Sequence, residues 1–133
     1  MRYALDTNTI SYILQNIKGV AQRWQLEEAQ GNIVSIPLIA YHEVKRGLIK
    51  AGATSKLSAL EKLCNTIEID DITAQDADTA IRIYAKLRGQ GNLIDDADIL
   101  IAAQSINRGY TLVTSNTKHF DRIDGLNFVD WVK

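Results

Sequence analysis

Three acidic positions carry the side chains that hydrolytic chemistry needs. Asp6 directly follows a short apolar stretch at residues 3–5, and open α/β sheets bind ligands where their strands end. Glu43 lies in a helical stretch after the second predicted strand, and Asp98 lies at the start of a strongly apolar helix. Carboxylates brought together can hold a divalent metal ion that activates water against a phosphodiester. One carboxylate could also take the proton of that water.

These acids also have purely structural interpretations. Glu43 could be a solvated helix residue that pairs with Arg46. Asp95, Asp96 and Asp98 could cap their helix and complement its dipole. Three acids exceed what capping requires, however, and a bound cation would offset their mutual repulsion. Oxygen ligands, without cysteine pairs or histidine pairs, favour Mg²⁺ or Mn²⁺ over zinc.

Several neutral residues next to these acids are supporting candidates. Thr7 and Asn8 could orient Asp6 or contact a substrate, although they could equally shape the turn and cap the following helix. Asn116 follows the predicted strand that ends at Thr114, and could orient a carboxylate, hold a metal-bound water or simply form a turn. Thr114 is a further candidate.

The histidines and tryptophans are weaker candidates. His42 and His119 lie far apart in the sequence and form no metal motif, so we assign both to surface or packing roles. Trp24 and Trp131 could stack on nucleobases, but a core or dimer role is the better interpretation.

Strands that alternate with helices must position these residues. Short apolar stretches predict strands at residues 2–5, 33–36, 66–69, 110–114 and 126–129. Helical spacing predicts helices at residues 9–15, 18–30, 37–51, 54–64, 73–87 and 95–107, with a polar loop or short helix at 115–124. This alternation predicts an α/β fold with a central, mostly parallel sheet of four or five strands, covered by helices on both faces.

Length and composition fit one globular domain, residues 1–133, with 46% hydrophobic and 23% charged residues. No apolar run approaches the ~18 residues of a membrane span, and no signal peptide is visible. A single cysteine excludes an internal disulfide. We therefore expect a cytoplasmic protein without membrane association. The net charge of -1 does not by itself indicate nucleic-acid binding.

Five segments, in this order, resemble PIN-domain proteins. They are Leu5–Asn8, His42–Gly47, Asp96–Ala103, Gly109–Asn116 and His119–Leu126. Each motif is weak alone, but the five together span nearly the whole chain. The short length and the closing segment most resemble the VapC toxins of bacterial type II toxin–antitoxin systems.

The resemblance implies a PIN-like three-layer sandwich and a Mg²⁺- or Mn²⁺-dependent endoribonuclease that cuts RNA, often tRNA, and halts translation. It implies Asp6, Glu43 and Asp98 as the catalytic, metal-holding triad. Asn116 stands where many relatives have a fourth acid, and Asp96 is the residue that could substitute for it. The family also implies a cognate antitoxin that blocks the site, and homodimers, for which we expect the helices between residues 54 and 87 to supply the interface.

Two other functions remain open at this point. A phosphatase with a strand-end aspartate as nucleophile typically has a second aspartate two residues on, where this chain has Asn8. A PIN-like fold without catalysis could bind RNA or protein, since a fold alone does not prove activity. The absence of a triad acid would favour that alternative, and all three acids are present.

Overall fold

The fold is built on a parallel sheet of five strands. A computed structural model describes residues 1–133. Its strands are β1 (Arg2–Leu5), β2 (Ile33–Pro37), β3 (Glu68–Asp70), β4 (Thr111–Val113) and β5 (Asn127–Val129). They pair in the order β3-β2-β1-β4-β5, and every pair is parallel. The predicted α/β fold is confirmed, with the larger of the two predicted strand numbers.

Helices fill the connections between the strands. They are α1 (Thr7–Gln15), α2 (Val20–Ala29), α3 (Leu38–Lys50), α4 (Thr54–Cys64), α5 (Ala74–Gly89), α6 (Asp96–Arg108) and α7 (Thr117–Phe120). The first six lie within two residues of the predicted ends, and α7 falls in the segment predicted as a polar loop or short helix. Helix α1 begins at Thr7 rather than Thr9, because Asp6 caps it.

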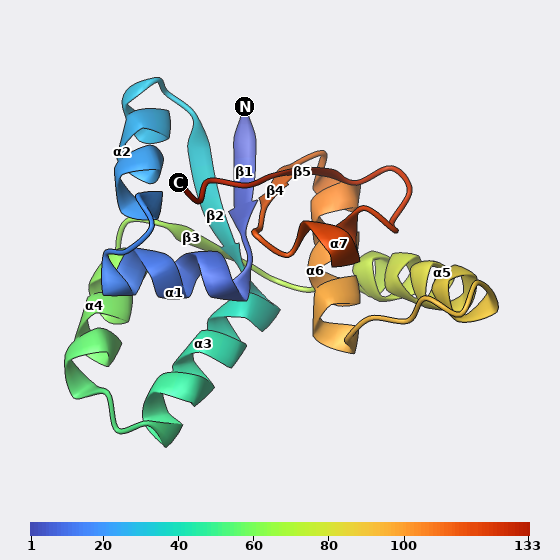
Figure 1. Ribbon diagram of the computed structural model, residues 1–133, viewed down its shortest axis with the longest axis horizontal. Coiled ribbons are helices and arrows are strands. Elements are labelled where there is room, and N and C mark those ends of the chain that lie inside the picture. The colour runs from blue at the N-terminus through green and yellow to red at the C-terminus, as the bar shows by residue number, and fades with distance from the viewer.

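The topology places helices on both faces of the sheet. Connections between parallel strands are right-handed, so α1 to α4, which link β1, β2 and β3, share one face. The chain then crosses to the other side of β1, which places α5, α6 and α7 on the opposite face. Figure 1 shows α1 to α4 on one side of the strands and α5 and α6 on the other. The strand order reverses between β1 and β4, where open α/β sheets form a ligand crevice.

The core surrounds β1 and α6. Leu5 of β1 and Leu112 and Val113 of β4 are fully buried. Ile101, Ala102 and Ala103 of α6 are also fully buried, which confirms the prediction of a central helix. This packing fixes the start of α6, where Asp98 lies, beside the end of β1.

A buried ion pair joins α5 to α6. A capping box begins α5, with Thr73 and Asp76 bonded reciprocally. Asp76 is 1% exposed and accepts a bond from Asn107 at 2.8 Å, while Arg108 lies 3.1 Å from it. These contacts lower the pKa of Asp76, although burial alone would raise it.

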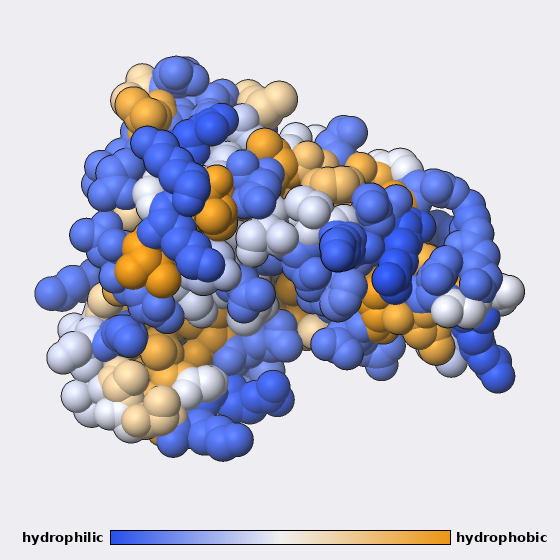
Figure 2. Space-filling model, in the orientation of Figure 1, coloured by the Kyte–Doolittle hydropathy of each residue, from blue (hydrophilic) through white to orange (hydrophobic).

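Most of the surface seen in Figure 2 is hydrophilic, with separate hydrophobic areas near α3 and α4 and along α5. Ile49 of α3 and Ile81 and Tyr84 of α5 are exposed apolar residues in these helices. None of the helices combines the length and the apolar character that crossing a membrane requires. Trp131 is buried and packs edge-on against Tyr3, as the core interpretation predicted.

Candidate active site

Asp6 lies at the end of β1, in the crevice between β1 and β4. Its side chain is buried and caps α1 by accepting a bond from the backbone N–H of Thr9 at 2.8 Å. The side chain of Thr114, which follows β4 and is fully buried, lies near Asp6 and lowers the pKa of its carboxyl. Burial raises the pKa of Asp6, the contacts with Thr114 and Thr9 lower it, and the charge of Asp98 raises it, with a net increase. The hydrogen bonds to the Asp6 carboxylate therefore do not fully offset the cost of burying its charge.

Glu43 reaches the same crevice from α3. Helix α3 starts directly after β2, and β2 pairs with β1, so the early turns of α1 and α3 lie near each other. The Thr7 hydroxyl donates a hydrogen bond to Glu43 Oε1 at 2.7 Å. No ion pair joins Glu43 to Arg46, so the structural interpretation of Glu43 as a solvated partner of Arg46 is wrong.

Asp98 contacts His119, which in turn contacts Asn116, and both of these residues follow β4. His119 Nδ1 lies 3.4 Å from Asp98 Oδ2 and 2.8 Å from Asn116 Nδ2. Phe120 is fully buried and anchors the short helix α7, which holds His119 in place. Burial raises the pKa of Asp98, the His119 contact lowers it, and the charges of Asp95 and Glu43 raise it, with a net increase.

These residues share one cavity of about 200 Å³, which we call the acid cavity. It is lined by Asp6, Thr7, Asn8, Glu43, Asp95, Asp98, Asn116 and His119, without a hydrophobic, lysine or arginine residue. The structure therefore brings together the three predicted acids and the supporting residues Thr7, Asn8 and Asn116. Thr114 does not line the acid cavity, but its side chain lowers the pKa of Asp6.

Sequence and fold comparisons assign this chain to a known family. The PIN domain family matches residues 3–126. The chain belongs to the PIN domain family. It is similar to the tRNA(fMet)-specific endonuclease VapC of Shigella flexneri, with 30% identity over 98% of each chain. It is 35% identical to Ribonuclease VapC1 of Methanocaldococcus jannaschii over 80% of this chain and 76% of that protein.

Solved VapBC structures have the same fold as this PIN domain. VapBC2 from Rickettsia felis, bound to a promoter DNA fragment, contains a chain with a TM-score of 0.90 and 29% identity, covering 98% of this chain and 99% of that one. DNA-bound VapBC from Salmonella typhimurium gives a TM-score of 0.88 at 28% identity, covering 98% of each chain. These matches confirm the predicted PIN-like fold and the VapC-type resemblance.

The donor set of this PIN domain fits a hard divalent cation. Four carboxylates line the acid cavity, those of Asp6, Glu43, Asp95 and Asp98, and no lysine or arginine neutralises them there. As placed, no three of the His, Cys, Asp and Glu side chains are close enough to form a complete metal site. Burial, followed by the charges of neighbouring carboxylates, raises the pKa values of Asp6 and Asp98, and a bound cation would favour their charged forms. Oxygen donors of this kind suit Mg²⁺ or Mn²⁺.

The structure places one supporting candidate, Asp96, outside the acid cavity. Asp96 does not line the acid cavity and instead lines an apolar pocket with Ala80 and Ile81 of α5. Asp95 takes the place expected of Asp96, because Asp95 and Asp98 are three positions apart and share a helix face, whereas Asp96 is rotated away. Asp95 begins α6 with the backbone of a cap, but its side chain makes no capping bond.

His119 is the residue of this PIN domain that the sequence analysis missed. It was assigned a surface or packing role because the two histidines form no metal motif. The spacing between Asn116 and His119 could have predicted that both side chains face the same site, since residues three apart on a helix lie on the same side. His42 is exposed and lies outside the acid cavity, in agreement with the surface role.

Proposed function

We propose that this VapC-type PIN domain is a metal-dependent endoribonuclease, the toxin of a type II toxin–antitoxin pair. The observation that carries the proposal is the acid cavity itself. It lies at the reversal point of the sheet and contains four carboxylates without a lysine or arginine neighbour. Relatives of similar length are named VapC ribonucleases and endonucleases.

Asp6, Glu43 and Asp98 would hold Mg²⁺ or Mn²⁺, with Asp95 as a further acid. Such an ion, when bound, activates water and stabilises charge on the phosphodiester oxygens. The protein's own contribution is to orient the ligands. The backbone N–H of Thr9 holds Asp6, Thr7 holds Glu43, and His119 contacts Asp98. One carboxylate of the acid cavity accepts the proton of the attacking water.

The names of the relatives support a substrate class and a partner. The Shigella flexneri protein is named for tRNA(fMet), so tRNA is the first substrate class to test, and cleavage would inhibit translation. The Rickettsia felis and Salmonella typhimurium structures are VapBC complexes, which supports a cognate antitoxin for this chain. Because an RNA used in translation would be cut where translation takes place, we propose that the protein acts in the cytoplasm. We also propose a homodimer, formed through α4 and α5.

The deciding experiment is cleavage of bulk tRNA by the purified protein, freed of any co-purifying partner. Wild type, Asp6→Asn and Asp98→Asn are compared with Mg²⁺, with Mn²⁺ and with EDTA. Asparagine caps helices as well as aspartate does, so Asp6→Asn should stay folded. The matched control is Asp96→Asn. Asp96 lies in α6, as Asp98 does, but its side chain faces away from the acid cavity.

We expect discrete fragments from wild type and Asp96→Asn with metal, and none from the other two variants or with EDTA. Full activity of Asp6→Asn would refute the proposed site. RNA binding by a folded, metal-loaded protein that yields no product would instead favour a PIN domain without catalysis.

A further inference from the structure

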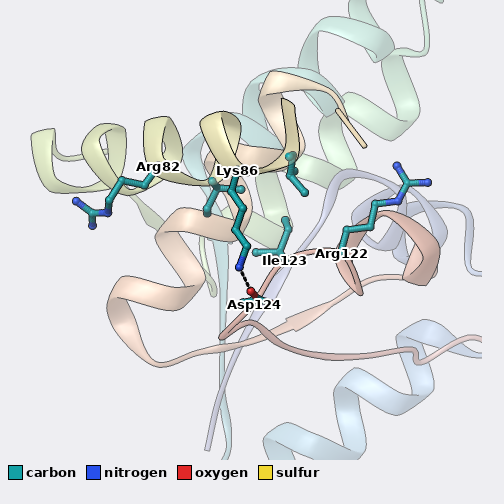
Figure 3. A pocket seen from close by; sticks show the side chains of 7 residues that line it. Arg82, Lys86, Arg122, Ile123 and Asp124 are labelled. Atoms are coloured by element: carbon teal, nitrogen blue, oxygen red, sulfur yellow. Dashed lines mark hydrogen bonds and ion pairs between the residues drawn. The ribbon is translucent and has the colours of Figure 1, made fainter. Parts of the chain in front are cut away.

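A second pocket lies outside the acid cavity, between α5 and the segment that follows α7. It measures about 160 Å³ and is lined by Arg82, Ile83, Lys86, Leu87, Arg122, Ile123 and Asp124 (Figure 3). Leu87 and Ile123 are buried and form an apolar floor. Arg82, Lys86 and Arg122 are exposed, and we call these three residues the cationic row.

The charges of the cationic row are spread out rather than focused on one point. Figure 3 shows the guanidinium groups of Arg82 and Arg122 extending away from the pocket in opposite directions, with Lys86 between them. A small anion would require converging donors. Separated cations instead suit a polymer that carries one charge at each repeat.

Most of this positive charge is available to a ligand. Arg82 donates to the Thr79 hydroxyl, and Arg122 to the Asn92 carbonyl. Neither has a carboxylate partner within 4.0 Å. Lys86 pairs with Asp124, but this pair is exposed, and exposed ion pairs contribute little stability. A phosphate could therefore displace Asp124 from Lys86.

The cationic row is connected to the acid cavity through two short segments. Arg122 follows His119 by three residues, so their Cα atoms are at most about 11 Å apart. Asn92, which accepts the bond from Arg122, precedes Asp95 by three residues. His119 and Asp95 both line the acid cavity. One end of the cationic row therefore lies close to the acid cavity.

A polyanionic substrate needs cations outside the acid cavity. The four carboxylates there repel phosphate groups, and the chain as a whole carries a formal charge of -1. We propose that the cationic row binds backbone phosphates of the RNA strand beyond the bond that is cut. This inference rests on the proposed nuclease function. Phosphate contacts of this type position a nucleic acid without reading its sequence.

The test is a salt titration of RNA binding. Affinity for a fluorescent single-stranded RNA oligonucleotide and for bulk tRNA is measured by anisotropy in the Asp6→Asn background, which we expect not to cleave. Arg82→Gln, Lys86→Gln and Arg122→Gln are combined in one variant. For single strands, each phosphate contact contributes about −0.7 to the slope of log affinity against log salt concentration. Loss of three contacts should therefore make the slope shallower by about 2.

Two further variants make the test specific to the pocket. Asp124→Asn frees Lys86 and should tighten RNA binding. Arg88→Gln removes an exposed charge from the same helix but outside the pocket, and should leave the slope unchanged. All of these side chains are exposed, so the variants should keep their melting temperature.

The outcomes separate this inference from the nuclease proposal. An unchanged slope in the triple variant overturns the inference, even if the same triple variant with Asp6 restored still cleaves RNA. A decreased slope supports the inference, even if no variant ever cleaves RNA. Unchanged RNA binding together with weaker binding of the cognate antitoxin also overturns it, and assigns the cationic row to the protein partner.

Discussion

Thr7 donates a hydrogen bond from its hydroxyl to Glu43 Oε1 at 2.7 Å, and this bond joins α1 to α3 at the acid cavity. A hydrogen bond to a charged group contributes about 1.5–3 kcal/mol. It also restricts a long side chain that would otherwise rotate freely. The position of Glu43 therefore depends on a residue that is itself neutral.

Thr7→Val should reduce kcat for RNA cleavage about tenfold, because it removes the hydroxyl while keeping the shape, and a change of about 1.4 kcal/mol corresponds to a factor of ten. Thr7→Ser retains a hydroxyl and should recover most of the rate. Both variants should melt near the wild-type temperature. Equal rates for valine and wild type would show that Glu43 does not need this bond.

Asp95→Asn should weaken Mn²⁺ binding about tenfold, the lower end of the effect of residues that support metal ligands. Asp96→Asn should leave the affinity unchanged, because only Asp95 lines the acid cavity. Calorimetric titration of Mn²⁺ into each purified variant gives the comparison. A larger effect of Asp96→Asn would restore the assignment made from the sequence.

Metal-free Asp6→Asn should be more stable than wild type at neutral pH. The folded-state pKa of Asp6 is raised, chiefly by burial. Between the ordinary carboxyl pKa, about 3.9, and that raised value, the folded protein holds a proton that the unfolded chain has released. Stability is therefore lost as pH rises through this interval, whereas the asparagine side chain of the variant does not titrate.

The difference between Asp6→Asn and wild type should shrink as pH falls toward about 4, as measured by urea unfolding in EDTA. Glu28→Gln neutralises an exposed carboxylate and serves as the control. Saturating Mn²⁺ should stabilise wild type more than Asp6→Asn. A difference that stays constant with pH would show that the Asp6 charge does not strain the fold.

The order of strands and helices could be predicted from the sequence because hydrophobic spacing determines it. The fine arrangement around Asp98 could not. Asp95 and Asp96 are equivalent as sequence candidates, and only the rotation of α6 decides which faces the acid cavity. His119 joins Asp98 through the packing of Phe120, a contact between segments about 20 residues apart that no local pattern encodes.

Asp76→Ala should lower the free energy of unfolding by about 3 kcal/mol, because it leaves Arg108 without its carboxylate partner in a largely buried site. Asp78→Ala, two residues along the same helix, removes an exposed carboxylate and should change stability by less than about 0.5 kcal/mol. Chemical denaturation at neutral pH measures both. Equal effects would mean that the pair with Arg108 does not hold α5 against α6.

The pairing of β1 with β4 determines when the acid cavity can form during synthesis. Tyr3 lies opposite Thr111. The strand β1 leaves the ribosome first, but it cannot pair with β4 until nearly the whole chain has been synthesised. Such distant pairing forms slowly. Asp6 consequently meets Thr114, Asn116 and His119 only when the chain is nearly complete. A nascent or truncated chain therefore lacks the assembled cavity, and the ribosome that makes this protein carries an inactive product until the end of translation.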